Sequence, residues 1–336
     1  IPFAKIYNDV CVAINRSGKR RGAAMISMEI WHLDFEDFLD LKKNTGDERR
    51  RTHDLHTASW IPDLFMQRVE EDGDWTFFSP NEVPELHHIY GKAFKEKYEE
   101  YEKLAKEGKL RQHKTIKAKA LYRRMLTNLF ETGSGWFTFK DPSNIRSPQD
   151  HVGVIHNTNL CTEILENNSK EESANCNLHP INMAEFVNDG VIDFTQLKYT
   201  IETVVRALDN VIDLNFYPVE EPRTANFRHR PIGLGMMGWQ DFLYKLKIPF
   251  DSEKAIEIAD RMTEFISYEA IKASCILAKE RGAYSTFKGS KWDRGIFPID
   301  TLSCLEEERG EKLNTDRKTW LGEEKWNELK KLVKEY

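Results

Sequence analysis

Cysteine, long apolar runs and an excess of basic charge are all scarce in this sequence. The 336 residues include only five cysteines, which form no paired C-x-x-C motif: Cys11, Cys161, Cys176, Cys275 and Cys304. Such sparse cysteines argue against a disulfide framework and favour a reducing, cytoplasmic location. No run approaches the roughly 18 apolar residues that a membrane helix needs. The formal net charge of −6 gives no reason to expect nucleic acid or an anionic membrane as a partner.

The beginning of the chain lacks two further features. The first residues, IPFAKIYNDV, contain no initiator methionine and no basic flank, apolar stretch or cleavage site of a signal peptide. We therefore expect the chain to be a piece of a longer product. Its composition, 40% hydrophobic and 31% charged, is ordinary for a soluble globular protein with one large core or two smaller ones.

Strand patterns alternate with long helical patterns, which is typical of an α/β fold. Short apolar runs predict buried strands at 22–31, 135–139 and 152–155. Helical periodicity predicts helices at 34–44, 85–107, from about 194, at 252–280 and at 323–336. The basic stretch 109–124 is predicted to be the solvated face of a helix, because only Tyr122 there could stack on a base.

Two of the predicted helices carry a clear buried face. Within 85–107, an aromatic residue recurs every three or four positions, at Tyr90, Phe94, Tyr98 and Tyr101. The helix that begins near Phe194 has apolar residues spaced i, i+4, i+7, i+8: Leu197, Ile201, Val204, Val205, Leu208 and Ile212. The next long helix is expected to begin at Ser252 and to stop at Gly282.

A short stretch in the middle of the chain, HNTNLCTEILENN (156–168), carries candidate chemistry. In an extended segment alternate side chains point the same way, so Asn159, Cys161 and Glu163 would share one face. Leu160 and Ile164 would face the core and hold the segment still. An amide, a thiol and a carboxylate would then converge on one small volume.

The acidic neighbour decides which thiol chemistry fits. A nucleophilic cysteine needs a nearby cation, whereas a carboxylate such as Glu163 keeps the proton on the Cys161 sulfur. The trio suits a neutral thiol that loses a hydrogen atom beside a carboxylate that accepts a proton. Cys176 follows fifteen residues later, across a polar stretch that predicts a turn, so the two segments could return as neighbouring strands. Two alternatives stay open. Cys161 could be a buried residue with a purely structural role, or Cys161, Cys176 and His179 could bind a metal ion.

At these residues the sequence resembles a known family. NLCTEI (159–164) followed by CNLHPINM (176–183) is similar to the catalytic α, or large, subunit of class I ribonucleotide reductases. Further stretches in the same order, among them FETGSGWFTFKDPSNIRSP and RPIGLGMMGWQDFLYKL, extend the resemblance over nearly the whole chain. The resemblance implies part of a ten-stranded α/β barrel with the catalytic cysteine on an interior loop. Residues 1–336 would be a single catalytic barrel domain, and an incomplete one.

The resemblance also implies a role for each candidate residue in the reduction of ribonucleoside diphosphates to deoxyribonucleotides. Cys161 would be the thiyl radical that takes the 3′ hydrogen, and Glu163 would accept the proton of the 3′ hydroxyl. Asn159 would hold the ribose hydroxyls. Cys176 would be one of two thiols that supply the electrons and end as a disulfide. Because a radical intermediate must be kept from water, an interior and dry site is needed.

The segment NRSGKRRGAA (15–24) resembles the second specificity loop of the family, which links a bound effector nucleotide to substrate choice. Its cationic side chains could contact phosphate, ribose or base: Arg16, Lys19, Arg20 and Arg21. Its glycines would let the loop change shape. A basic turn on the surface, without any ligand, explains the same residues equally well.

The resemblance further implies partners for the chain, and two alternative functions stay open. The chain itself would bind no cofactor and no metal. The radical would come from a metal-containing small subunit, and the electrons from a thioredoxin- or glutaredoxin-type reductant. The remaining parts of the large subunit, ribonucleotide substrates, nucleotide effectors and a second large subunit would complete the assembly, so the chain alone is expected to be inactive. A cobalamin-dependent reductase and a non-catalytic paralogue that binds nucleotides or partners are the alternatives.

Two shorter motifs carry less weight. GLGMMG (233–238) matches G-x-G-x-x-G but follows NFRHRP, which cannot be the apolar strand of a dinucleotide-binding unit. Its glycines instead predict close packing at the start of a helix. Glu85-x-x-His88 has the spacing of di-iron ligands, yet such a site needs a second copy of the motif and two further glutamates.

Overall fold

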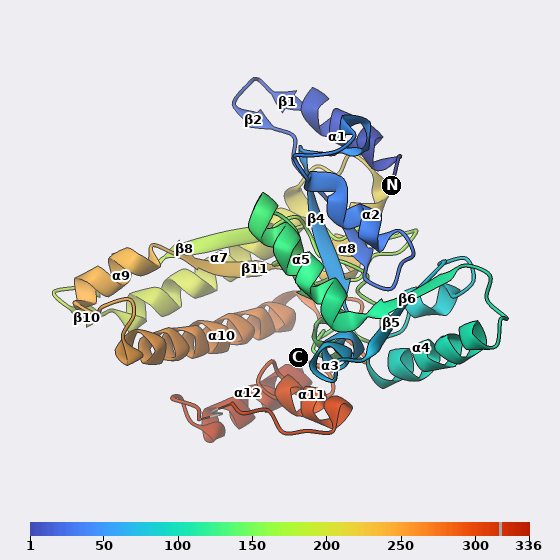
Figure 1. Cartoon of the computed structure of the whole chain (residues 1–336). Helices are drawn as coiled ribbons and strands as arrows, with labels where there is room; N and C mark the ends of the chain where they lie inside the picture. Colours follow the sequence, from blue (N-terminus) through green and yellow to red (C-terminus); the bar gives the residue numbers. More distant parts are fainter. Residues whose placement is uncertain (316–317) are drawn as a thin grey trace. The chain divides into compact units, whose positions relative to one another are not determined.

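The computed structural model describes residues 1–315 and 318–336, without the side chains of Asn15 and Arg16, and Figure 1 traces the chain. The chain divides into two compact units, each built from more than one stretch of sequence. The first unit comprises residues 1–147, 154–166 and 302–312, and the second unit comprises residues 148–153, 167–301 and 313–336. The single catalytic domain predicted over residues 1–336 stays a prediction.

The first unit contains a three-stranded parallel sheet in the order β3-β4-β7. Its strands are β3 (Ala24–Glu29), β4 (Leu55–Ile61) and β7 (Trp136–Phe139). Nearly every side chain of the middle strand, β4, is buried. A middle strand of a parallel sheet is covered on both faces, which explains why β4 does not alternate between apolar and polar residues.

Helices and antiparallel strand pairs complete the first unit. The strand pairs are β1 (Asn15–Arg16) with β2 (Arg20–Arg21), and β5 (Asp74–Phe78) with β6 (His113–Lys117). The helices are α1 (Ala4–Ala13), α2 (Phe35–Leu39), η1 (Asp40–Lys42), η2 (Glu48–Arg50), α3 (Asp63–Glu70), η3 (Pro84–His87), α4 (Gly91–Lys106), α5 (Ala118–Thr132), α6 (Lys140–Ile145) and all but the first residue of α11 (Thr301–Arg309).

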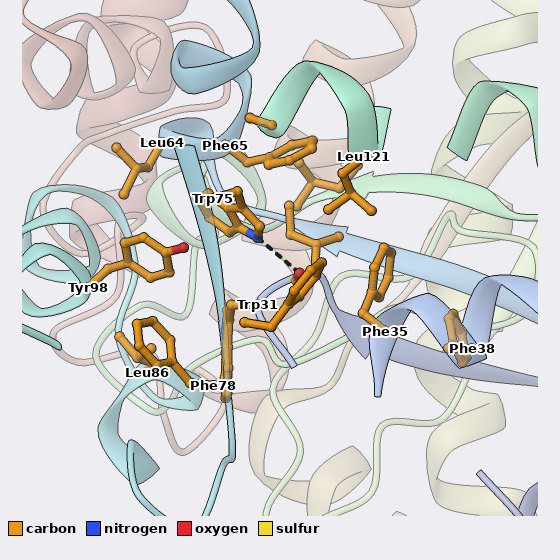
Figure 2. Packing of buried hydrophobic residues seen from close by; sticks show 14 of the residues in the cluster. Trp31, Phe35, Phe38, Leu64, Phe65, Trp75, Phe78, Leu86, Tyr98 and Leu121 are labelled. Atoms are coloured by element: carbon orange, nitrogen blue, oxygen red, sulfur yellow. Dashed lines mark hydrogen bonds between the residues drawn. The ribbon is translucent and has the colours of Figure 1, made fainter. Parts of the chain in front are cut away.

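The core of the first unit is rich in aromatic side chains (Figure 2). The indole of Trp75 stacks on the ring of Tyr98, with the ring centroids 4.5 Å apart, and its Nε1–H donates to the carbonyl oxygen of Ile30 at 3.0 Å. Burying the indole N–H with a partner avoids the penalty of an unsatisfied donor. The aromatic stripe predicted for this region is confirmed at Phe94, Tyr98 and Tyr101, which α4 buries, but not at Tyr90, which precedes the helix and is half-buried.

The second unit contains two long helices, α7 (Phe194–Leu214) and α10 (Glu253–Arg281), which lie side by side (Figure 1). The six residues predicted for the buried face of α7 are all buried: Leu197, Ile201, Val204, Val205, Leu208 and Ile212. The α10 helix begins where the Ser252 hydroxyl accepts the N–H of Ala255 at 3.2 Å, and it ends at Gly282, whose φ is 89°. The predictions for both helices are confirmed.

Short strands and helices make up the rest of the second unit. The strand β8 (Leu178–Asn182) pairs in parallel with β11 (Gly233–Met237), and β9 (Val187–Asn188) pairs antiparallel with β10 (Val191–Ile192). The remaining helices are η4 (Met183–Phe186), α8 (Glu220–His229), α9 (Trp239–Leu246) and α12 (Glu323–Glu335). Gly238 precedes α9 with a φ of 67°, and a Cβ there would clash with Oδ1 of Asn182. The close packing predicted for the glycines of GLGMMG is therefore confirmed at Gly238, whereas it is wrong at Gly235, where a Cβ would meet open space.

Strands and helices mix along the chain, so the predicted α/β class is confirmed. In the described ranges the strands form separate sheets of two or three strands and no closed barrel. The ten-stranded barrel therefore stays a prediction. Among the described helices, none combines the length and the apolar character needed to cross a membrane.

Two predicted elements were wrong. The basic stretch 109–124 is not one helix face, because the exposed strand β6 precedes α5 within it. The sequence HKTIK contains β-branched residues that pair with β5, and such residues favour strands. The apolar run 152–155 forms no strand, because its buried residue Ile155 is hydrogen-bonded to a side chain instead of a neighbouring strand.

Candidate active site

The stretch that carries Asn159, Cys161 and Glu163 forms a turn. The N–H of Thr162 donates to the carbonyl oxygen of Asn159 at 3.1 Å. Thr162 has a φ of 69°, in the left-handed region that L-residues seldom adopt. The prediction that the three side chains alternate along an extended segment is therefore wrong, although Asn159 and Cys161 lie in one turn and Glu163 directly follows it.

The side chain of Asn159 explains why the segment turns. Its Oδ1 accepts the N–H of Ile164 at 3.0 Å and the hydroxyl hydrogen of Thr158 at 3.2 Å. Asparagine often makes such local bonds, which draw a backbone away from strand geometry. The Nδ2 atom of Asn159 makes no hydrogen bond within the described part of the chain, so its two donor hydrogens are available to a ligand.

Cys161 and Glu163 are both exposed. Neither the Cys161 thiol nor the Glu163 carboxylate has a hydrogen-bond or ion-pair partner among the residues that the structure describes. Within this part of the chain, the dry enclosure predicted around the thiol is not formed. A thiol and a carboxylate on one turn are nevertheless placed to act on the same bound molecule.

The backbone before the turn is fixed by Asn144, on α6. Asn144 and Ile155 are both buried. The Oδ1 of Asn144 accepts the N–H of Ile155 at 2.7 Å, and its Nδ2 donates to the carbonyl oxygens of Ile155 and Lys140, at 2.9 Å each. One side chain thus satisfies both backbone groups of Ile155, as a neighbouring strand would.

Three imidazole rings meet at the next residue, His156. Its Nε2 lies 3.0 Å from Nδ1 of His88, and its ring stacks on that of His87 with centroids 4.4 Å apart. Burial, together with the nearby His87, His88 and Lys140, lowers the pKa of His156 to about 4. The ring is therefore neutral near pH 7, and it shares one hydrogen bond with His88 without charge repulsion.

A buried ion pair adjoins the histidines. Lys140 is 0% exposed and Glu29 is 7% exposed. The Nζ of Lys140 donates to both carboxylate oxygens of Glu29, at 3.0 Å each, and to the carbonyl oxygen of Leu86 at 2.7 Å. Glu29 also accepts the Nε1–H of Trp31 at 2.6 Å and lies 2.9 Å from Nδ1 of His87. Burial lowers the pKa of Lys140, and the attraction of Glu29 opposes this shift.

Sequence reasoning did not single out these supporting residues. The available signal was a charged residue next to an apolar run: Glu29 lies inside the predicted strand 22–31, and Lys140 directly follows the predicted strand 135–139. A charge in or directly after a buried strand indicates that it has a partner, because an unpaired buried charge is unstable, but it does not specify which residue that partner is. Asn144 carried no comparable signal.

Cys176 lies in the second unit, where it is exposed and closely precedes β8. The next residue, Asn177, is buried, and its carbonyl oxygen accepts the N–H of Gly233 at 2.8 Å. The Nδ2 of Asn177 donates to the carbonyl oxygen of Pro231 at 3.0 Å. These bonds fix the backbone beside the Cys176 thiol. The predicted proximity of Cys176 to Cys161 stays a prediction.

The cationic segment forms the hairpin β1–β2, with residues 17–19 as its turn. Lys19, Arg20 and Arg21 are exposed and have no ion-pair partner in the described ranges. The side chain of Arg16 lies outside the described residues. Three exposed cations on one hairpin form a surface that suits phosphate, but effector binding stays a prediction.

Gly22 follows this hairpin and contacts the C-terminal end of α1. Its N–H donates to the carbonyl oxygen of Ile14 at 2.5 Å, and a Cβ at this position would lie 2.6 Å from the carbonyl oxygen of Cys11. Such a contact with backbone cannot be relieved by rotating a side chain, so only glycine fits here. The base of the hairpin is therefore held against the end of α1.

Within residues 1–315 and 318–336, no three histidine, cysteine or acidic side chains are arranged to hold a metal ion. Glu85 accepts the hydroxyl hydrogen of Tyr101, whereas His88 contacts His156, so the two residues of the di-iron spacing have different partners. His179 lies in β8.

The whole sequence, residues 1–336, matches the family model described as the ribonucleotide reductase barrel domain. The chain belongs to this family. The α subunit of ribonucleoside-diphosphate reductase from Chlamydia muridarum is 55% identical over 336 residues, which are 100% of this chain and 32% of the relative. The large chain from Neurospora crassa is 43% identical over 303 residues, 89% of this chain and 32% of the relative. The large subunit from Variola virus is 42% identical over 306 residues, 91% of this chain and 39% of the relative.

Membership in the ribonucleotide reductase barrel family confirms the resemblance drawn from NLCTEI and CNLHPINM. The chain spans about a third of the length of the first two of these relatives. All three relatives are named as ribonucleoside-diphosphate reductases, which gives no support to a cobalamin-dependent enzyme or to a non-catalytic paralogue. The roles of the individual side chains in this chain stay predictions.

Proposed function

We propose that this chain is the radical-bearing part of the large subunit of a class I ribonucleotide reductase that reduces ribonucleoside diphosphates. The supporting observation is the family match over residues 1–336, within which Asn159 and Cys161 occupy one turn and Glu163 directly follows it. In the complete subunit this turn would lie on an interior loop of the ten-stranded barrel. The barrel would enclose the exposed thiol and exclude water from the radical.

The proposed reaction starts at Cys161. As a thiyl radical, its sulfur takes the hydrogen atom from C3′ of the ribose, which leaves a carbon radical. Glu163 accepts the proton of the 3′ hydroxyl, while the 2′ hydroxyl takes up a proton and leaves as water. Cys176 and a second thiol supply two electrons and two protons and end as a disulfide. Cys161 then returns its hydrogen atom to C3′, which restores the thiyl radical.

Asn159 would orient the sugar for these steps. Its Oδ1 is engaged by the N–H of Ile164, which fixes the direction of the amide group. The Nδ2 hydrogens are then directed at a ribose hydroxyl that acts as an acceptor. Holding the sugar in one orientation reduces the entropic part of the barrier to hydrogen transfer.

The reaction needs partners that supply the radical and the electrons. We infer a metal-containing small subunit as the radical source and a thioredoxin- or glutaredoxin-type protein as the reductant. The relatives are named as α subunits or large chains, which supports a second kind of subunit in the assembly. Two large subunits would associate as a homodimer. The sparse cysteines support a reducing, cytoplasmic location, where the thiols stay available.

Turnover by variants of the complete large subunit tests the proposal. Assembled with its small subunit and a dithiol reductant, the wild-type protein should form deoxyribonucleoside diphosphates. Cys161→Ser should abolish product, because the stronger O–H bond of serine does not yield the radical that takes the C3′ hydrogen. Glu163→Gln should lower kcat by about 10²- to 10⁴-fold, the range of general base catalysis. Cys304→Ser, outside the motif, is the matched control and should keep wild-type turnover; product formation by Cys161→Ser would overturn the proposal.

We further propose that the β1–β2 hairpin contacts an effector nucleotide. Replacing one exposed cation, Arg20→Ala, should weaken effector binding by about 10-fold, which corresponds to one charge-assisted hydrogen bond. Turnover without effector should stay unchanged. Lys95→Ala removes an exposed cation from α4 and serves as the control. Equal effector affinity of wild type and Arg20→Ala, measured by calorimetry, would contradict this assignment.

A further inference from the structure

The turn that carries Cys161 depends on a buried side chain of another helix for its position. We propose that Asn144 is a positioning residue for Cys161: it fixes the backbone at Ile155, and so sets where the turn at 159–162 presents the thiol. The inference rests on the proposed function, in which Cys161 is the radical residue. Asn144 itself touches neither the thiol nor any reacting atom in this assignment.

The amide group of Asn144 uses both of its donor hydrogens and its oxygen in hydrogen bonds to backbone. Both hydrogens of Nδ2 are used, by the carbonyl oxygens of Ile155 and Lys140, and Oδ1 accepts the N–H of Ile155. Asn144 is 2% exposed and Ile155 is 1% exposed, so water does not replace these bonds when the amide is removed. Loss of the amide would leave two buried backbone groups of Ile155 unsatisfied, which drives the segment to rearrange.

Side-chain contacts restrain the backbone between Ile155 and Cys161. His156 is held by His88, and Thr158 is buried and donates to Asn159. Asn159 in turn closes the turn through Ile164. Because the Cys161 side chain has no partner of its own among the described residues, the place of its sulfur is set by this backbone. A shift at the first fixed point is therefore passed to the thiol.

The chain offers a matched control for this amide. Asn128, on α5, is also 2% exposed and belongs to the same first unit. Its Oδ1 has no hydrogen-bond partner in the described part of the chain. Asn128→Ala therefore removes a buried amide of the same size without removing a bond to residues 154–166. Any loss common to both variants reports general destabilisation and not positioning.

Amide hydrogen exchange of the complete large subunit tests the structural half of the inference. Asn144→Ala should speed exchange at Ile155 and across 156–164 by at least about 10-fold, the effect of losing roughly one net hydrogen bond. Asn128→Ala should leave exchange in this segment at the wild-type rate. Asn144→Asp keeps one acceptor for the Ile155 N–H and should fall between the two. Wild-type exchange in Asn144→Ala would overturn the inference.

Steady-state kinetics of the assembled reductase tests the catalytic half. Asn144→Ala should lower kcat by about 10²-fold with KM within about 2-fold, because misplacing a catalytic group by about 1 Å has an effect of this size. Asn128→Ala should keep both constants, and Asn144→Asp should restore part of kcat. Equal losses in Asn144→Ala and Asn128→Ala, or an unchanged kcat in Asn144→Ala, would overturn the assignment. A wild-type subunit without turnover would instead count against the proposed function, and the exchange experiment would still decide whether Asn144 holds the segment.

Discussion

Replacing Lys140 with methionine isolates the contribution of the buried ion pair in the first unit. Methionine keeps most of the length of the lysine stem but carries no charge. The variant leaves the Glu29 carboxylate buried against an apolar side chain. It also removes the donor to the carbonyl oxygen of Leu86, which Lys140 reaches at 2.7 Å. The same change disturbs α6, the helix that carries Asn144.

The size of the effect follows from the partners that remain. Removing one partner of a buried ion pair destabilises a protein by about 3–5 kcal/mol, because it leaves an uncompensated charge. Glu29 keeps the Trp31 Nε1–H at 2.6 Å and its contact with His87 at 2.9 Å. We therefore expect a loss of about 3 kcal/mol in the free energy of unfolding. The double variant Glu29→Gln/Lys140→Met removes the buried charge but keeps an acceptor for Trp31, so it should recover about 2 kcal/mol of this loss.

Urea unfolding followed by tryptophan fluorescence measures these free energies, and amide exchange in β3 and α6 assigns the loss to the first unit. Lys95→Met, at an exposed position of α4, is the matched control and should stay within about 0.5 kcal/mol of wild type. The reasoning is refuted if Lys140→Met is as stable as this control. It is also refuted if the double variant unfolds more easily than the single one.

Three further variants test other parts of the account. His156 has a pKa of about 4 in the folded chain against an ordinary value of 6.5. The stability that the neutral ring contributes is therefore present above pH 6.5 and is lost as the pH falls through 4. His156→Asn should remove this pH dependence, measured as the free energy of unfolding in urea over a pH series. Asp141→Ala should lower the free energy of unfolding by about 2 kcal/mol in thermal unfolding, because this buried carboxylate accepts the first N–H groups of α3 and α4 at 2.7 and 3.0 Å. Gly22→Ala should destabilise α1 and the hairpin in amide exchange, since its Cβ would lie 2.6 Å from backbone, whereas Gly235→Ala meets open space and should not.

Local periodicity predicted the helices well, because their burial follows from spacing alone. The buried face of α7 was assigned correctly at every one of its predicted positions, from Leu197 to Ile212. The same reasoning failed at 159–163, where alternation suggested an extended segment. There a single side-chain bond from Asn159 to the N–H of Ile164 decides the backbone, and periodicity contains no information about such a bond.

The candidate site divides in the same way. The spacing of Asn159, Cys161 and Glu163 could be found from the sequence, and the resemblance could name their roles. The residues that support them could not, because they are distant in the chain: Lys140 and Glu29 are 111 positions apart. Their pairing depends on how strands from different parts of the sequence join one sheet, which a single sequence does not specify.

Hydrogen abstraction by Cys161 is the central claim, and tritium release from a ribonucleoside diphosphate labelled at C3′ tests it most directly. The complete wild-type subunit, with its small subunit and reductant, should form product that keeps its tritium at C3′, because Cys161 returns the hydrogen that it takes. Cys176→Ser forms no product, so the tritium left on the Cys161 sulfur should exchange into water, and Cys161→Ser/Cys176→Ser should release none. Release by this double variant at the rate of Cys176→Ser would show that another group cleaves the C3′–H bond, and would contradict the account.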